Sequence, residues 1–140
     1  MQKAVLDTNI LVSGILYEAG PQAKLLALAR LGKFEVFLSV DIISELRSVL
    51  LRPKFNLTER EVDSAIKELL KFCKIIVPSE KLNVVKADPD DNAIIEAAVA
   101  GRAQFIVSGD KHLLDIKKFR DAKIVNTFEF FKELAEQTGH

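Results

Sequence analysis

The fold of this chain is constrained most by a regular alternation of short β-type segments with longer helical ones. The predicted strands are short and rich in Val, Ile and Phe; they span Ala4–Asp7, Glu35–Ser39, Ile75–Pro78, Phe105–Ser108 and Lys123–Asn126. The segments between them show helical spacing and helix-end signals; they span Asn9–Tyr17, Pro21–Leu31, Asp41–Leu51, Thr58–Phe72, Asp90–Gly101, Lys111–Phe119 and Thr127–Gln137. Strands separated by helices predict an α/β fold with a mainly parallel sheet of about five strands and helices on both faces.

Length and composition predict one ordinary globular domain, residues 1–140, built around a single core. Basic and acidic residues balance to a net charge of zero, which argues against a protein that coats nucleic acid by charge alone. The apolar run before Asp7 is too short for a signal peptide, and no stretch is long enough to span a membrane, so we expect a cytoplasmic protein. The lone Cys73 lies in a helical stretch and is predicted to be a buried structural thiol.

Two local signals refine this outline. Thr58 and Glu61 have the spacing of a capping box, in which each side chain accepts a hydrogen bond from the other residue's backbone amide. The stretch Ser79–Pro89 shows neither helical nor strand periodicity and is predicted to be a loop.

Four acidic residues lie where a carboxylate is costly unless it faces a cation or several hydrogen-bond donors. Asp7 and Asp110 follow apolar strands, Glu45 borders the apolar stripe of its helix, and Asp91 heads a core-facing stripe. Ligands of parallel sheets collect at the carboxyl ends of the strands. The sequence therefore predicts one shared acidic pocket at that edge.

Three of these acids also have ordinary explanations. The Glu45 carboxylate could extend to solvent or pair with Arg47 or a neighbouring lysine. Asp7 and Asp110 could each form a turn, and Asp110 could also cap the helix that follows. Taken one at a time, none of the three positions decides between these interpretations.

The fourth acid, Asp91, belongs to the acidic start of a helix, where carboxylates complement the helix dipole. Capping needs one or two acids, so we assign that role to Asp88 or Asp90 and leave Asp91 for another task. Several carboxylates in one pocket cannot all ionise without a compensating cation, and oxygen ligands suit Mg²⁺ or Mn²⁺. His112 and His140 lack metal-ligand spacing and are predicted to lie on the surface.

Four motifs in order resemble those of the PIN domain family over the whole chain. They are Asp7-Thr8-Asn9 after the first strand, Glu45 on the helix after the second, the run Asp91–Ala98, and Ser108-Gly109-Asp110-Lys111-His112-Leu113-Leu114. The chain looks most like small stand-alone PIN proteins that serve as toxins of toxin–antitoxin pairs (VapC-like). The resemblance implies a three-layer α/β/α sandwich. It also implies a metal-dependent ribonuclease that uses one or two Mg²⁺ or Mn²⁺ ions.

By position, the acidic quartet of the family falls on Asp7, Glu45, Asp91 and Asp110, and its hydroxyl and amide helpers fall on Thr8, Asn9 and Ser108. Basic residues around the mouth would bind substrate, and the positional candidates are Lys111, Arg47, Arg52 and Lys54, whose alternative is ordinary solvated charge. RNA and a protein antitoxin are the expected partners. The family also forms homodimers, for which the helices near Leu25–Leu31 and Leu69–Phe72 could supply a surface. An RNA-processing nuclease outside a toxin–antitoxin pair and an inactive binding module remain alternatives.

Overall fold

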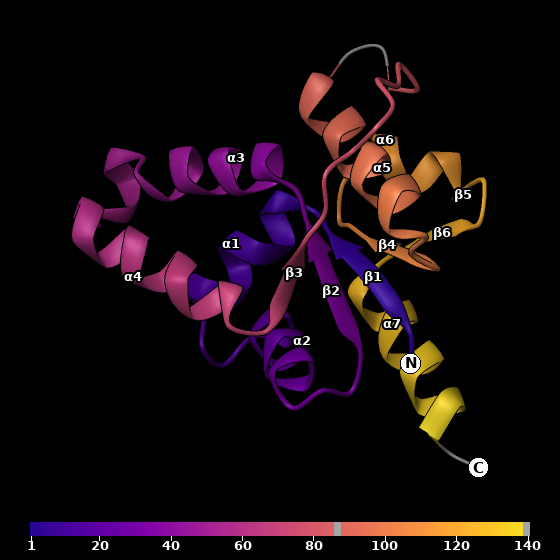
Figure 1. The fold of residues 1–140 in the computed structure, drawn as a ribbon. Coiled ribbons are helices and arrows are strands. Elements are labelled where there is room, and N and C mark those ends of the chain that lie inside the picture. The colour runs from indigo at the N-terminus through magenta and orange to yellow at the C-terminus, as the bar shows by residue number, and fades with distance from the viewer. Residues whose placement is uncertain (86–87, 139–140) are drawn as a thin grey trace.

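The computed structural model describes residues 1–85 and 88–138. Within these residues one sheet is formed in the order β3-β2-β1-β4-β6-β5 (Figure 1). Its strands are β1 (Lys3–Leu6), β2 (Glu35–Leu38), β3 (Cys73–Ile75), β4 (Phe105–Val107), β5 (Lys118–Phe119) and β6 (Ala122–Val125). Every neighbouring pair is parallel except β5 and β6. The predicted α/β fold with a mainly parallel sheet is therefore confirmed.

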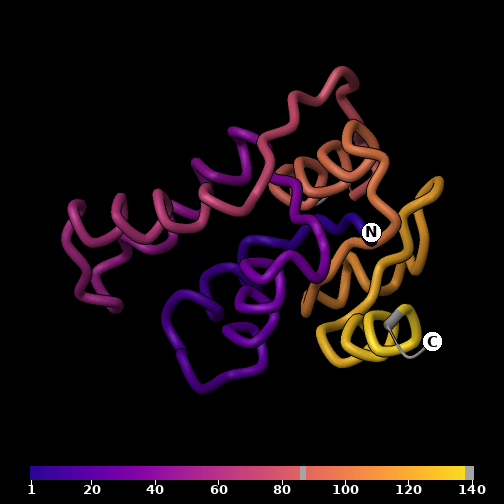
Figure 2. The backbone as a smooth tube through the Cα atoms, turned by 60° about the horizontal axis from the view of Figure 1, so that its bottom comes forward, coloured from indigo at the N-terminus to yellow at the C-terminus, as the bar shows by residue number. Residues whose placement is uncertain are grey.

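Helices cover both faces of this sheet and complete the predicted α/β/α sandwich. They are α1 (Thr8–Leu16), α2 (Pro21–Arg30), α3 (Val40–Leu50), α4 (Glu59–Leu70), α5 (Pro89–Gly101), α6 (Lys111–Ile116) and α7 (Thr127–Thr138), with a 3-10 helix at Pro53–Phe55. Helix α5 packs on β1, β2 and β4, whereas α7 packs on β4 and α2 from the other side (Figure 2). Helices α3 and α4 extend together to one side of the sheet. No helix in the described ranges is long and apolar enough to cross a membrane.

The core lies along the central strands. All of β4 and the last three residues of β1 are buried, as expected for parallel strands covered on both faces. Phe130 of α7 closes one side of the core with edge-on contacts to Phe34 and Phe105, at ring-centroid distances of 4.9 and 5.4 Å. A Cβ atom at Gly101 would come within 2.6 Å of the Phe37 ring, so this glycine lets α5 approach β2 closely.

Two predicted elements are wrong in their bounds. The third strand is Cys73–Ile75, not Ile75–Pro78, because these three residues pair with the last three residues of β2, which ends at Leu38. Cys73 is thus in a strand and not in a helix. It is buried as predicted, and burial raises the pKa of its thiol to about 12.

The other correction adds a strand. The helix predicted to run to Phe119 ends at Ile116, because Lys117 adopts a φ of 67° that no α-helix can contain. Residues Lys118–Phe119 then pair antiparallel with β6. The sheet consequently has six strands and not about five.

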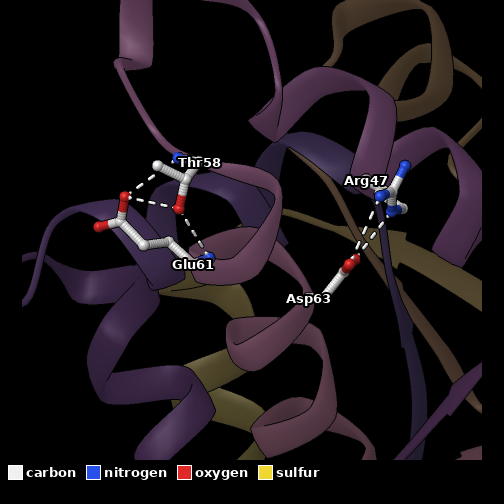
Figure 3. Close-up of polar contacts among 4 residues, drawn as sticks. All are labelled: Arg47, Thr58, Glu61 and Asp63. Carbon is white, nitrogen blue, oxygen red and sulfur yellow. Dashed lines mark hydrogen bonds and ion pairs between the residues drawn. The ribbon is translucent and has the colours of Figure 1, made fainter.

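The predicted capping box of α4 is confirmed. The Thr58 hydroxyl accepts a hydrogen bond from the Glu61 amide at 3.1 Å, and the Glu61 carboxylate accepts one from the Thr58 amide at 3.0 Å (Figure 3). This cap fixes the start of the helix that packs beside α3.

Candidate active site

Two of the predicted acids are placed by neighbouring strands. Asp7 follows β1 and Asp110 follows β4 by three residues, and these strands are parallel neighbours whose carboxyl ends meet at one edge. The Asp7 amide donates to the Val107 carbonyl at 3.0 Å, which continues the pairing of the two strands into the site. The sheet therefore brings Asp7 and Asp110 to the same place.

The other two acids come from helices. Glu45 lies in the middle of α3 and Asp91 in the first turn of α5, and these two helices pack against each other. All four acids line one small cavity of about 90 Å³. Its described lining is Asp7, Thr8, Asn9, Glu45, Asp88, Asp90, Asp91, Ile94 and Asp110. The structure thus brings together the predicted quartet and, from the predicted helpers, Thr8 and Asn9.

Asp110 caps a helix as predicted, and Asp7 caps one as well, which was not predicted. Asp7 Oδ1 accepts a hydrogen bond from the Ile10 amide, and Asp110 Oδ1 accepts one from the His112 amide, each at 3.0 Å. Both carboxylates therefore cap a helix and line the cavity. Capping fixes their orientation at the edge of the sheet.

Ser108 connects Asp7 with Asp110. Its side chain is fully buried, its hydroxyl donates to Asp7 Oδ2, and its oxygen accepts a hydrogen bond from the Asp110 amide at 2.9 Å. One hydroxyl thus holds a carboxylate of one strand against the backbone of the next. The Asn9 backbone amide also lowers the pKa of Asp7.

Two further acids belong to the cavity and were predicted only as helix caps. Asp88 does cap α5, since its Oδ1 accepts from the Asp90 amide at 3.0 Å, but both Asp88 and Asp90 also line the cavity. The Asp90 carboxyl hydrogen-bonds the Glu45 carboxyl across the two helices. This contact depends on how α3 and α5 pack, and the sequence carries no signal for it.

The crowding of carboxyl groups shifts their titration. The hydrogen bond with Asp90, followed by burial, raises the pKa of Glu45 to about 7. Burial, followed by the hydrogen bond and the charge of Asp110, raises the pKa of Asp91 to about 7. Burial also raises the pKa of Asp7, although the Ser108 hydroxyl and the Ile10 amide oppose that shift. Neighbouring carboxyl groups in this cavity therefore share protons, unless a bound cation takes the place of those protons.

The cavity suits a hard divalent cation. Its described lining includes six acids and no basic residue. Asp91 Oδ2 is buried and has no hydrogen-bond donor among the described residues, so it is the oxygen that a cation would satisfy. In the described ranges, no group of three or more His, Cys, Asp or Glu side chains is placed so that it could hold a metal ion as it is. An ion would therefore have to draw the carboxylate ends together.

The predicted substrate-binding residues on α3 and just after it differ in position. The Arg47 guanidinium donates to both carboxylate oxygens of Asp63, at 2.8 and 3.4 Å, and so lies between α3 and α4 (Figure 3). Arg47 is absent from the described lining of the cavity. The positive charge of Arg52, in contrast, lowers the pKa of Glu45 and therefore acts on the site.

The remaining predicted basic residues lie outside the cavity. The Lys54 ammonium group lies 5.0 Å from the centroid of the Phe55 ring. Lys111 is exposed at the start of α6, directly after Asp110. His112 is exposed as predicted, and His140 lies outside the described residues.

Asn92 and Glu96 are two buried polar residues of α5 that had no predicted role. Asn92 Oδ1 accepts from the amides of Val84 and Val85 at 2.9 and 2.8 Å, and its Nδ2 donates to the Val85 carbonyl at 2.8 Å. Glu96 Oε2 accepts from the Leu82 amide at 2.8 Å. These side chains hold the loop before α5 against the helix. Their spacing of four residues inside an apolar run was the signal that could have shown it.

Comparison with known proteins agrees with this architecture. The PIN domain family matches residues 3–112. The uncharacterized protein MJ1680 of Methanocaldococcus jannaschii is 30% identical over 118 residues, which cover 82% of this chain and 75% of that protein. The crystal structure of VapBC2 from Rickettsia felis bound to a DNA fragment from their promoter contains a chain with the same fold. That chain superposes with a TM-score of 0.65 and 20% identity, over 89% of this chain and 98% of its own length.

The fold and the acid-lined strand edge define an α/β protein with a carboxylate cavity at the carboxyl ends of β1 and β4. The chain belongs to the PIN domain family. PIN domains are in general nucleases that use divalent metal ions.

Proposed function

We propose that this protein is a divalent-metal-dependent endoribonuclease and the toxin of a toxin–antitoxin pair. The observation that carries the nuclease proposal is the acid cavity at the carboxyl edge of the sheet. Six carboxyl groups surround it, and the buried Asp91 Oδ2 has no donor among the described residues. A site of this kind is costly to keep without a cation.

The residues would divide the work as follows. Asp7 and Asp110 would hold the principal Mg²⁺ or Mn²⁺ ion, with Asp91 beside them, and Glu45 would hold a second ion or act as general base. A bound ion of this kind makes water a better nucleophile and neutralises charge on the leaving oxygen. Ser108 orients Asp7 through its hydroxyl. The raised pKa of Glu45 suits a group that takes a proton near neutral pH.

The proposed partners are RNA, a protein antitoxin and a second copy of the chain. The toxin proposal is supported by the shared fold of the VapBC2 chain. A groove of about 270 Å³ between α1, α2 and α4 includes Ile15, Leu26, Leu69 and Phe72, which belong to or adjoin the helices expected to supply a dimer surface. Leu25 and Leu69 are buried in the core, which leaves Ile15, Leu26 and Phe72 as the apolar residues that a partner could reach.

Cleavage of single-stranded RNA tests the nuclease proposal. We expect cutting with Mg²⁺ or Mn²⁺ and none with chelator. Asp91→Asn should lower the rate by on the order of a hundredfold or more, because it removes the buried carboxylate that a cation would satisfy. Asp115→Asn is the matched control, since Asp115 is an exposed acid of α6 outside the described cavity lining. Equal cleavage by wild type and Asp91→Asn would refute the site.

A further inference from the structure

A second, larger hollow opens beside the acid cavity. It is a groove of about 540 Å³ between α3, the start of α5 and the loop residues Lys81 and Leu82. Glu45 and Asp90 line both the groove and the cavity. A nucleic acid whose phosphate lies at the acids can therefore place an adjoining nucleotide in the groove. The volume is within the range of sites that bind small organic groups.

The lining of this groove does not suit a phosphate. It contains the carboxyl groups of Asp41, Glu45, Asp90 and Glu96, and Lys81 is the one basic residue among the described lining residues. Phosphates would be repelled by this excess of negative charge. The groove instead offers hydrogen-bond acceptors, so it favours a group that is rich in donors.

The wall formed by α3 is open to a ligand. Asp41, Ser44, Glu45 and Ser48 lie on one face of the helix, as their spacing of three and four residues requires. The side chains of Asp41, Ser44 and Ser48 are exposed, and within the described part of the chain none of them has a hydrogen-bond partner. On the opposite wall, Asn92 and Glu96 fix the loop, so the width of the groove is set by the fold.

We propose, on the premise of the nuclease function above, that this groove reads a base of single-stranded RNA by its donor-bearing edge, with guanine as the base it fits best. Unstacked bases of single strands are recognised by hydrogen bonds along their Watson–Crick edges. Guanine presents N1–H and the N2 amino group side by side, which matches the two oxygens of one carboxylate. Uracil presents one donor between two acceptors, and the acidic lining would repel both acceptor oxygens. Asp41 is the specificity-determining residue, because its carboxylate is unpaired and lies outside the acid cavity.

Binding of short RNA tests this without relying on cleavage. Fluorescence anisotropy with Mg²⁺ would compare uridine hexamers that carry one central guanosine or one central inosine, which differ only in the N2 amino group. The protein carries Asp91→Asn so that the RNA stays intact. We expect guanosine to bind about tenfold more tightly. Adding Asp41→Asn should bring the ratio close to one, and adding Ser48→Leu should do so by filling the groove. Adding the control Asp115→Asn should leave it unchanged.

Equal binding of the two hexamers would overturn the proposal, as would a guanosine preference that survives both Asp41→Asn and Ser48→Leu. The two proposals fail differently. Metal-dependent cleavage by the wild type with no preference between guanosine and inosine contradicts base reading alone. A guanosine preference that depends on Asp41, without any metal-dependent cleavage, contradicts the nuclease function alone.

Discussion

At the scale of single residues, Ser108 connects the two strand-end acids. It is fully buried, donates to Asp7 and accepts from the Asp110 amide. Its hydroxyl also opposes the rise in the pKa of Asp7 that burial causes. One small side chain therefore keeps a buried carboxylate both oriented and easier to ionise.

Ser108→Ala should destabilise the protein by about 1–3 kcal/mol, because a buried carboxylate and a backbone amide lose their partner. It should also weaken the stabilisation by Mn²⁺, since Asp7 becomes harder to ionise. Denaturant unfolding with and without Mn²⁺ measures both effects. Ser39→Ala is the matched control: Ser39 is also buried and caps α3, but lies outside the described cavity lining. An unchanged Mn²⁺ effect in Ser108→Ala would make Ser108 a purely structural residue.

At the scale of elements, the described part of the loop before α5, residues 79–85, is held by side chains and not by a sheet. Asn92 makes three hydrogen bonds to Val84 and Val85, and Glu96 makes one to Leu82. Arg120 of the β5–β6 turn adds an ion pair with Glu80 at 2.8 Å. The loop supplies one wall of the groove and leads to Asp88 at the acid cavity, so its position affects both hollows.

Asn92→Ala should cost about 2–4 kcal/mol, because three backbone groups lose their side-chain partner. Amide hydrogen exchange at Val84 and Val85 should accelerate by at least about tenfold more than at Ile106 in the core, which reports global unfolding. Thr58→Ala is the control. It removes the α4 capping box at a cost of about 1 kcal/mol, and it should accelerate hydrogen exchange at Val84 and Val85 by the same factor as at Ile106. Equal acceleration at Val84 and Ile106 in Asn92→Ala would contradict the role of Asn92 as a local latch.

The same elements show what a sequence can predict. Asp7 and Asp110 were predictable because the ends of buried strands are local features, and parallel neighbours must share an edge. Glu45 was predictable from the apolar stripe beside it. The Glu45–Asp90 contact was not, because it depends on the packing of α3 against α5. The strand β5 was missed because the helix before it ends at Lys117, a lysine with positive φ, and a lysine side chain does not predict that conformation.

At the scale of the whole molecule, equal numbers of acidic and basic residues give no net charge, yet six acids meet at one cavity. Local crowding therefore sets the pH dependence of stability. The pKa values of Glu45 and Asp91 rise from 4.5 and 3.8 to about 7 in the folded state. The folded protein thus binds protons more tightly than the unfolded chain. Without metal, the contribution of Glu45 and Asp91 to the free energy of unfolding should be greatest below about pH 4. It should fall by on the order of a few kcal/mol as the pH rises to about 7.

A divalent ion should reverse that loss, and the sign of the pH effect identifies the site. At a metal concentration a hundred times the Kd, stabilisation is about 2.7 kcal/mol, or roughly 8 °C in melting temperature for a chain of this size. The shift measured by calorimetry with Mn²⁺ should be larger at pH 8 than at pH 5, because protons compete with the ion for the same carboxylates. Asp7→Asn should reduce the shift at pH 8 most of all, whereas Asp115→Asn should preserve it. A shift that is the same in wild type and Asp7→Asn, or larger at pH 5, would mean that the ion binds elsewhere.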